Sequence, residues 1–76
     1  MNNTRRKEIG KVINQLEDLR DKVDELLSEE QEYLDNIPDN FQCSDRYCKA
    51  EESVEYLQSA YDSLDEVVSS LESSME

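Results

Sequence analysis

Apolar residues follow a heptad pattern along both halves of the chain. In the first half they step by three and four residues from Ile9 to Ile37, and only Glu30 interrupts them. In the second half the same spacing runs from Tyr47 to Met75 without interruption. Such spacing places one apolar stripe along an α-helix. The pattern predicts two long helices and an all-α fold.

The only proline, Pro38, marks the break between the two helices. Proline disfavours helical backbone at the residue before it, so the first helix should end a few residues earlier. We predict helices at about residues 4–35 and 45–74, joined by a loop at 36–44, in a single domain that spans 1–76. The candidate cap residues are Asn3 or Thr4 for the first helix and Ser44 or Asp45 for the second.

A short connection makes consecutive helices antiparallel neighbours, which predicts a coiled-coil-like hairpin. In this arrangement position a of one heptad faces position d of the other. Pairing residues whose numbers sum to 80 satisfies this rule, centres the turn on Asn40 and lets Phe41 close that end. The predicted pairs are Ile9–Leu71, Val12–Val68, Leu16–Leu64, Leu19–Tyr61, Val23–Leu57, Leu26–Val54, Glu30–Ala50 and Tyr33–Tyr47.

Two helices alone bury little apolar surface, and ordering each residue costs about 1.5 kcal/mol of conformational entropy. Further apolar residues lie beside the seam, at position e of the first helix and position g of the second. They widen each stripe to about three positions in seven, which is typical of a helix bundle. We therefore expect a homodimer that forms an antiparallel four-helix bundle. The candidate interface residues are Ile13, Leu27, Leu34, Ala60 and Val67.

The 76 residues, with a mass of 8.9 kDa, carry 20 acidic and 8 basic side chains, for a net charge of −12. Residues 1–11 carry a charge of +3 and residues 12–76 a charge of −15. This excess disfavours direct contact with nucleic acid or an anionic membrane and permits a basic protein partner. In the hairpin, the basic N-terminal residues should neutralise the negative end of the second helix.

The chain offers little for catalysis or for binding a cofactor or metal. It contains no His, so Cys43 and Cys48 lack a zinc-ligand set and a general base, and their spacing is awkward for a disulfide. Acidic residues near Pro38 lack the glycine of a calcium-binding loop. We expect no enzymatic activity, no catalytic residue, no cofactor and no metal. Without an apolar export or membrane-spanning segment, the expected localisation is cytoplasmic.

Two residues leave alternative interpretations open. Glu30 lies in the predicted seam, where it either reaches solvent or Lys49 past the small Ala50, or acts as a polar device that sets the register. Tyr56 is expected on the outer face of the second helix, as an ordinary surface tyrosine or as an anchor for a partner.

Three segments together carry a resemblance to known proteins: the basic opening RRKEI, the loop NIPDNFQ and the ending SLDEVVSSLE. The chain resembles small acidic helical-hairpin proteins of unknown function encoded by phages and prophages of gut bacteria. The resemblance implies a phage or bacterial-cytoplasm setting, and it supplies no activity and no site residues.

Two functions fit this sequence. The first is a structural or interaction module that self-associates or docks on a partner protein through apolar flanks of the hairpin. The alternative is an acidic inhibitor whose carboxylates mimic DNA phosphates and block a basic nucleic-acid-binding protein. A module should depend on its apolar residues, whereas a mimic should depend on salt and on acidic residues such as Glu17, Glu51 and Glu55.

Overall fold

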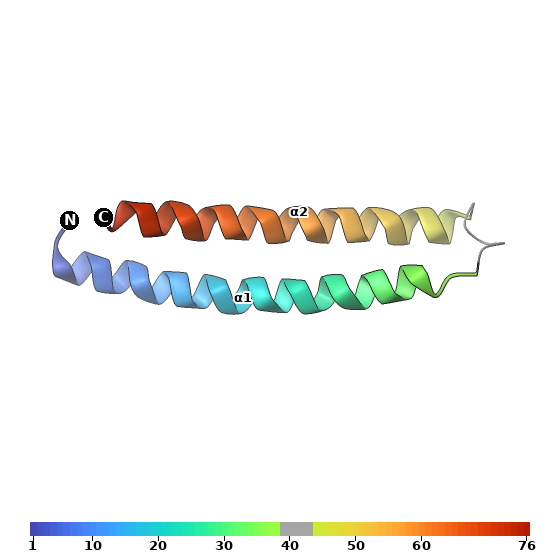
Figure 1. The fold of residues 1–76 in the computed structure, drawn as a ribbon, viewed down its shortest axis with the longest axis horizontal. Coiled ribbons are helices and arrows are strands. Elements are labelled where there is room, and N and C mark those ends of the chain that lie inside the picture. The colour runs from blue at the N-terminus through green and yellow to red at the C-terminus, as the bar shows by residue number, and fades with distance from the viewer. Residues whose placement is uncertain (39–43) are drawn as a thin grey trace.

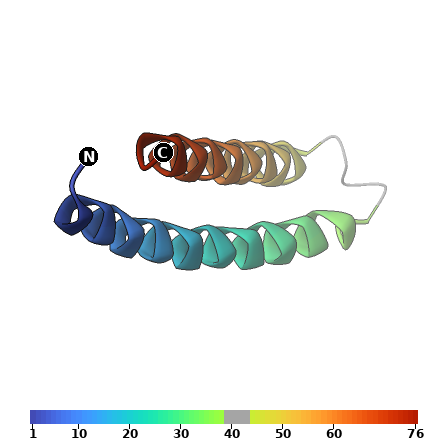
Figure 2. The same ribbon diagram turned by 60° about the vertical axis from the view of Figure 1, so that its left-hand side comes forward.

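The computed structural model describes residues 1–38 and 44–76 and confirms the all-α hairpin. Helix α1 spans Asn3–Asp35 and helix α2 spans Asp45–Ser74. The helices run antiparallel, with both chain termini at the same end (Figure 1), and they remain side by side in the turned view (Figure 2). The hairpin measures 59 × 15 × 13 Å. The predicted turn centre at Asn40 and the predicted role of Phe41 lie outside the described residues.

The first turns of both helices are capped by side chains. The Ser44 hydroxyl accepts a 3.2 Å hydrogen bond from the Tyr47 amide, which confirms one of the predicted caps of α2. At α1 the cap is Asn2, whose side-chain oxygen accepts a 2.7 Å bond from the Arg5 amide. The predicted cap at Asn3 or Thr4 was wrong by one or two residues, because the extended backbone of Asn2 already places its side chain over the first turn.

The basic N-terminus lies against the C-terminal end of α2, as expected. The Arg6 Nε donates a 3.3 Å hydrogen bond to the carbonyl oxygen of Met75, which caps α2. The carbonyl groups at a helix C-terminus carry partial negative charge and lack intrahelical partners, so a guanidinium group there is favourable. This contact ties the two ends of the chain together.

The buried stripe of α2 is the predicted one. Its members are all buried or half-buried, and Ala50 and Val68 are the most buried, each with 4% of its surface exposed. The stripe continues without a break to the C-terminal cap. Its residues are Tyr47, Ala50, Val54, Leu57, Tyr61, Leu64, Val68, Leu71 and Met75.

The seam on α1 differs from the prediction. Position a faces α2 as expected, but the second line of the seam is position e and not position d. Ile13 at position e is only 6% exposed, whereas the predicted d-position residues are largely open to solvent. The predicted pairings of Val12, Leu19 and Leu26 with α2 were therefore wrong, whereas Tyr33 contacts α2 at Arg46, the residue before its predicted partner Tyr47. The seam residues of α1 are Ile9, Ile13, Leu16, Arg20, Val23, Leu27, Glu30, Leu34 and, just beyond the helix, Ile37.

Arg20 is a charged member of this seam. Its Nη1 lies 2.8 Å from an Asp65 carboxylate oxygen, with 22% of the Arg20 side chain and 60% of the Asp65 side chain exposed. Among the described residues its Nε is buried without a hydrogen-bond partner. The free-energy cost of desolvating the guanidinium is therefore only partly offset by its interactions.

We predict opposite effects for the two members of this pair. Arg20→Leu should stabilise the hairpin by about 1 kcal/mol, because it removes an unsatisfied donor and adds apolar burial. Asp65→Ala should destabilise it by about 0.5–1 kcal/mol, because it leaves the half-buried cation unpaired. Urea denaturation followed by circular dichroism measures both changes. A loss of stability in Arg20→Leu would contradict this account.

Gly10 is the only glycine in the sequence and lies inside α1. A β-carbon built there meets nothing within 4 Å, and no described residue of the chain has a positive φ. Glycine in a helix interior costs about 0.5–1 kcal/mol relative to alanine. Gly10→Ala should therefore stabilise the hairpin by about this amount. An unchanged urea midpoint would show that this part of α1 contributes little to stability.

Candidate interaction face

Large apolar side chains are exposed along one side of α1. They occupy position d, and they recur every seven residues over four successive heptads. The exposed fractions are 44% for Val12, 51% for Leu19, 52% for Leu26 and 40% for Tyr33. Residues seven apart lie on one line of a helix, so these side chains form a continuous apolar stripe beside the seam.

The stripe of α1 lies on the same side of the hairpin as positions c and g of α2. A shallow hollow there is lined by Tyr33 of α1 together with Arg46, Lys49 and Ser53 of α2. Arg46 and Ser53 stand on the heptad line of Ala60 and Val67, and Lys49 stands on the line of Tyr56. We call this side the apolar face, formed by Val12, Leu19, Leu26 and Tyr33 of α1 and by Tyr56, Ala60 and Val67 of α2.

This face collects the exposed apolar side chains of the molecule. Among the described residues seven large hydrophobic side chains are exposed, and six of them belong to the apolar face. The seventh, Met1, precedes α1. The opposite side has a different character. There Arg20 pairs with Asp65, and polar residues such as Gln31, Asp35 and Gln58 line a separate hollow together with Leu27 and Val54 of the seam.

The charge is divided in the same way. Positions d and g of α1 and c and g of α2 hold four basic and two acidic side chains, a net charge of +2. The rest of the chain holds the other four basic and 18 acidic side chains, a net charge of −14. These heptad lines therefore hold few of the acidic residues that cover the remaining surface, although Glu30 and Asp45 also line the hollow beside Tyr33. Their charged residues are Arg5, Glu8, Lys22, Glu29, Arg46 and Lys49.

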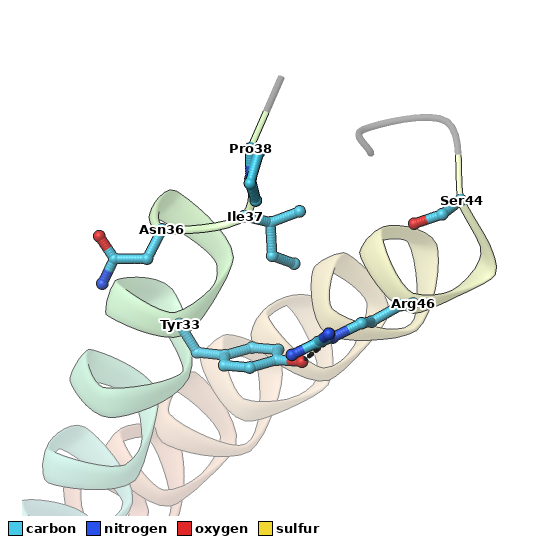
Figure 3. Close-up of a pocket in the computed structure, with 6 residues that line it drawn as sticks. All are labelled: Tyr33, Asn36, Ile37, Pro38, Ser44 and Arg46. Carbon is cyan, nitrogen blue, oxygen red and sulfur yellow. Dashed lines mark hydrogen bonds between the residues drawn. The ribbon is translucent and has the colours of Figure 1, made fainter. Parts of the chain in front are cut away.

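At the loop end, a polar clamp joins the helices across the apolar face. The Arg46 Nε donates a hydrogen bond to the Tyr33 hydroxyl, and the guanidinium carbon lies 5.3 Å from the centre of the tyrosine ring. Figure 3 shows the two side chains meeting between the end of α1 and the start of α2. This contact satisfies the polar tip of Tyr33 while its ring stays on the surface.

A hollow of about 590 Å³ adjoins this clamp, and among the described residues its lining includes Ile37 and Pro38 (Figure 3). Arg46 is the only charged side chain among those lining residues. Glu30 is half-buried in the seam and lines the neighbouring hollow together with Lys49 and Ala50.

The predicted interface residues fall into two groups. Ala60 and Val67 are exposed and belong to the apolar face. Ile13 is buried, and Leu27 and Leu34 are half-buried, in the seam between α1 and α2. Their placement on an open flank was wrong, because α1 turns position e and not position d toward α2. The apolar pattern predicted the d-position residues in the seam, but they are exposed in the structure. Apolar residues at three of every seven positions are typical of a helix that has a second contact surface.

Comparisons of this chain with protein families, with curated proteins and with solved structures give no match. Across residues 1–38 and 44–76, neither helix has the length and apolar content needed to cross a membrane. The same residues contain no group of three or more Cys, Asp or Glu side chains placed to hold a metal ion.

Proposed function

We propose that this protein is a small structural or protein-interaction module, which self-associates or docks on a partner protein through the apolar face. The observation that carries the proposal is the gathering of six exposed large hydrophobic side chains on one side of the hairpin. Contiguous apolar patches on a soluble surface mark interaction sites. The proposed role involves no catalysis, and the proposed setting is the cytoplasm of a bacterium in a phage or prophage context.

Two further features support this role. The apolar face carries a charge of only +2, so a partner approaching it avoids the acidic remainder of the chain. Val12, Leu19 and Leu26 also lie on a helix, which fixes their spacing better than a loop would. Their seven-residue spacing suits a second helix laid along α1.

The second candidate function is an acidic inhibitor that mimics DNA. The 18 acidic side chains outside the apolar face favour it, because such a surface can enter a basic cleft. Binding of this kind would depend on the acidic side and would weaken steeply with salt. Acidic surfaces also keep small proteins soluble, and solubility alone accounts for the same charge.

Affinity capture from bacterial lysate with matched variants tests the two functions. Leu19→Glu/Leu26→Glu alters the apolar face, and Glu51→Lys/Glu55→Lys alters the acidic side. We expect the first variant to lose the proteins that the wild type captures and the second to retain them. If the wild type captures other copies of the chain, this result also supports the interaction-module proposal.

The inhibitor function predicts the reverse result. One basic nucleic-acid-binding protein would be captured, released by salt and lost with Glu51→Lys/Glu55→Lys. The interaction-module proposal would then be wrong. Circular dichroism of both variants controls for loss of helical structure.

A further inference from the structure

We infer that the occupant of the apolar face is a second copy of this chain, with α1 of each copy lying antiparallel against α1 of the other. This inference rests on the proposed function and names the partner of the same face. The result is a four-helix bundle in which each copy covers the apolar face of the other. The acidic sides then point outward on both flanks.

The core of a single hairpin is thin, so the stability of one copy alone is marginal. Only Ile13, Ile37, Ala50 and Val68 are buried among the described apolar residues, and none of the described side chains is fully buried. Domains of this size commonly gain stability from disulfides, metals or association. A second copy would bury the stripe of α1 that α2 leaves exposed.

The size of the hairpin suits a dimer. The whole hairpin measures 59 Å by 15 Å, and the stripe from Val12 to Tyr33 covers about 32 Å of its length. Two hairpins that overlap over their whole length would bury roughly 1,800 Å², within the 1,200–2,000 Å² of a standard stable interface, with the stripe at the centre of the contact. A shorter partner, such as a single peptide helix, would cover α1 and leave Val67 and Tyr56 of α2 exposed.

The spacing of the stripe is symmetrical about its middle. Val12 and Tyr33 lie equally far from the midpoint between Leu19 and Leu26. When two copies of α1 align antiparallel about this midpoint, Leu19 of one copy meets Leu26 of the other, and Val12 meets Tyr33. A two-fold axis through the midpoint therefore matches an apolar residue to each member of the stripe.

Charge favours the antiparallel arrangement of the two copies. Two chains of −12 repel each other at long range, but the apolar faces that meet carry both signs and only +2 each. The antiparallel arrangement also places the loop end of one copy, with Arg46 and Lys49, at the open end of the other, where Arg5 and Glu8 carry opposite charges. A parallel arrangement would instead bring the basic loop ends together.

Sedimentation equilibrium tests the association. We expect twice the chain mass of 8.9 kDa at high micromolar concentration, and a melting temperature that rises with concentration. Leu19→Glu/Leu26→Glu should raise the dissociation constant about a hundredfold or more, because it places four carboxylates in the centre of the interface. Glu51→Lys/Glu55→Lys, on the acidic side, should leave the dimer intact.

Oxidative cross-linking tests the arrangement. In chains with Cys43→Ser and Cys48→Ser, a copy carrying Leu19→Cys should join a copy carrying Leu26→Cys. Disulfide cross-links between two copies of the same variant should be rare, since equivalent positions in the two copies lie about 10 Å apart in this alignment. Joining of Leu19→Cys to Ala60→Cys would instead show that α1 lies on α2 of the second copy.

The outcomes separate this inference from the proposed function. A mass of 8.9 kDa at all concentrations would overturn the second copy as occupant. Loss of a captured protein with Leu19→Glu/Leu26→Glu would then still support docking on a different partner. A dimer that survives this double substitution would overturn the apolar face as the interface. The antiparallel contact between the two copies of α1 would be overturned by either of two cross-linking results. One is a preference for disulfide cross-links between copies of the same variant, and the other is cross-linking of Leu19→Cys to Ala60→Cys.

Discussion

Val68→Asp is expected to unfold the hairpin. Val68 is 4% exposed, in the seam of α2 near the open end, and it is one of four buried apolar residues in the described chain. A carboxylate at this position would lose its hydration without gaining a partner. The expected loss is about 3 kcal/mol or more, which is enough to unfold a small domain of marginal stability. The measurement is the loss of helical circular dichroism at 222 nm in buffer.

Val67→Asp is the matched control, because Val67 is the neighbouring residue and is 45% exposed on the apolar face. The two substitutions share the same change in side chain and nearly the same change in helix propensity. At a concentration too low for association, Val67→Asp should keep its helical signal. If both variants unfold alike, the difference in burial between Val68 and Val67 does not determine stability, and the assignment of Val68 to the seam is contradicted. If neither unfolds, the core at Val68 contributes less than its burial indicates.

Moderate salt is expected to raise the melting temperature. Several pairs of acidic side chains stand four residues apart on the exposed sides of both helices, and each repels by about 0.2–0.5 kcal/mol. Screening four such pairs should gain about 1–2 kcal/mol, or roughly 5–10 °C in a chain of this size. The pairs are Asp21–Glu25, Glu25–Glu29, Glu51–Glu55 and Asp62–Glu66.

Glu25→Lys separates this effect from a general effect of salt. Glu25 is exposed and belongs to two of the repulsive pairs, so a lysine there turns both into attractive pairs. The variant should melt at a higher temperature than the wild type in low salt and should gain less when salt is added. An equal gain in both proteins would attribute the salt effect to something other than these pairs.

Much of the fold could be predicted because it depends on local chemistry. Pro38 ends α1 through its effect on the preceding residues, and Ser44 caps α2 through a bond to an amide three residues away. The buried stripe of α2 was also predictable, because heptad lines a and d are apolar throughout this helix. Ala60 and Val67 are the only apolar residues on the lines beside them. The sequence predicted that Ala60 and Val67 belong to an interaction surface. It placed the residues that α1 contributes to the apolar face in the seam instead.

The apolar pattern of this chain thus determined by itself that two helices form, where they end and that they fold back on each other. It left open which side of α1 faces α2. Lines d and e flank line a, and both combinations repeat every three and four residues, so periodicity favours neither. Only the tertiary structure decided, through contacts between distant residues: Ile13 on line e is buried in the seam, and Arg20 on the same line pairs with Asp65, 45 residues away. Packing turned line e inward, and line d was left as the exposed stripe of the apolar face.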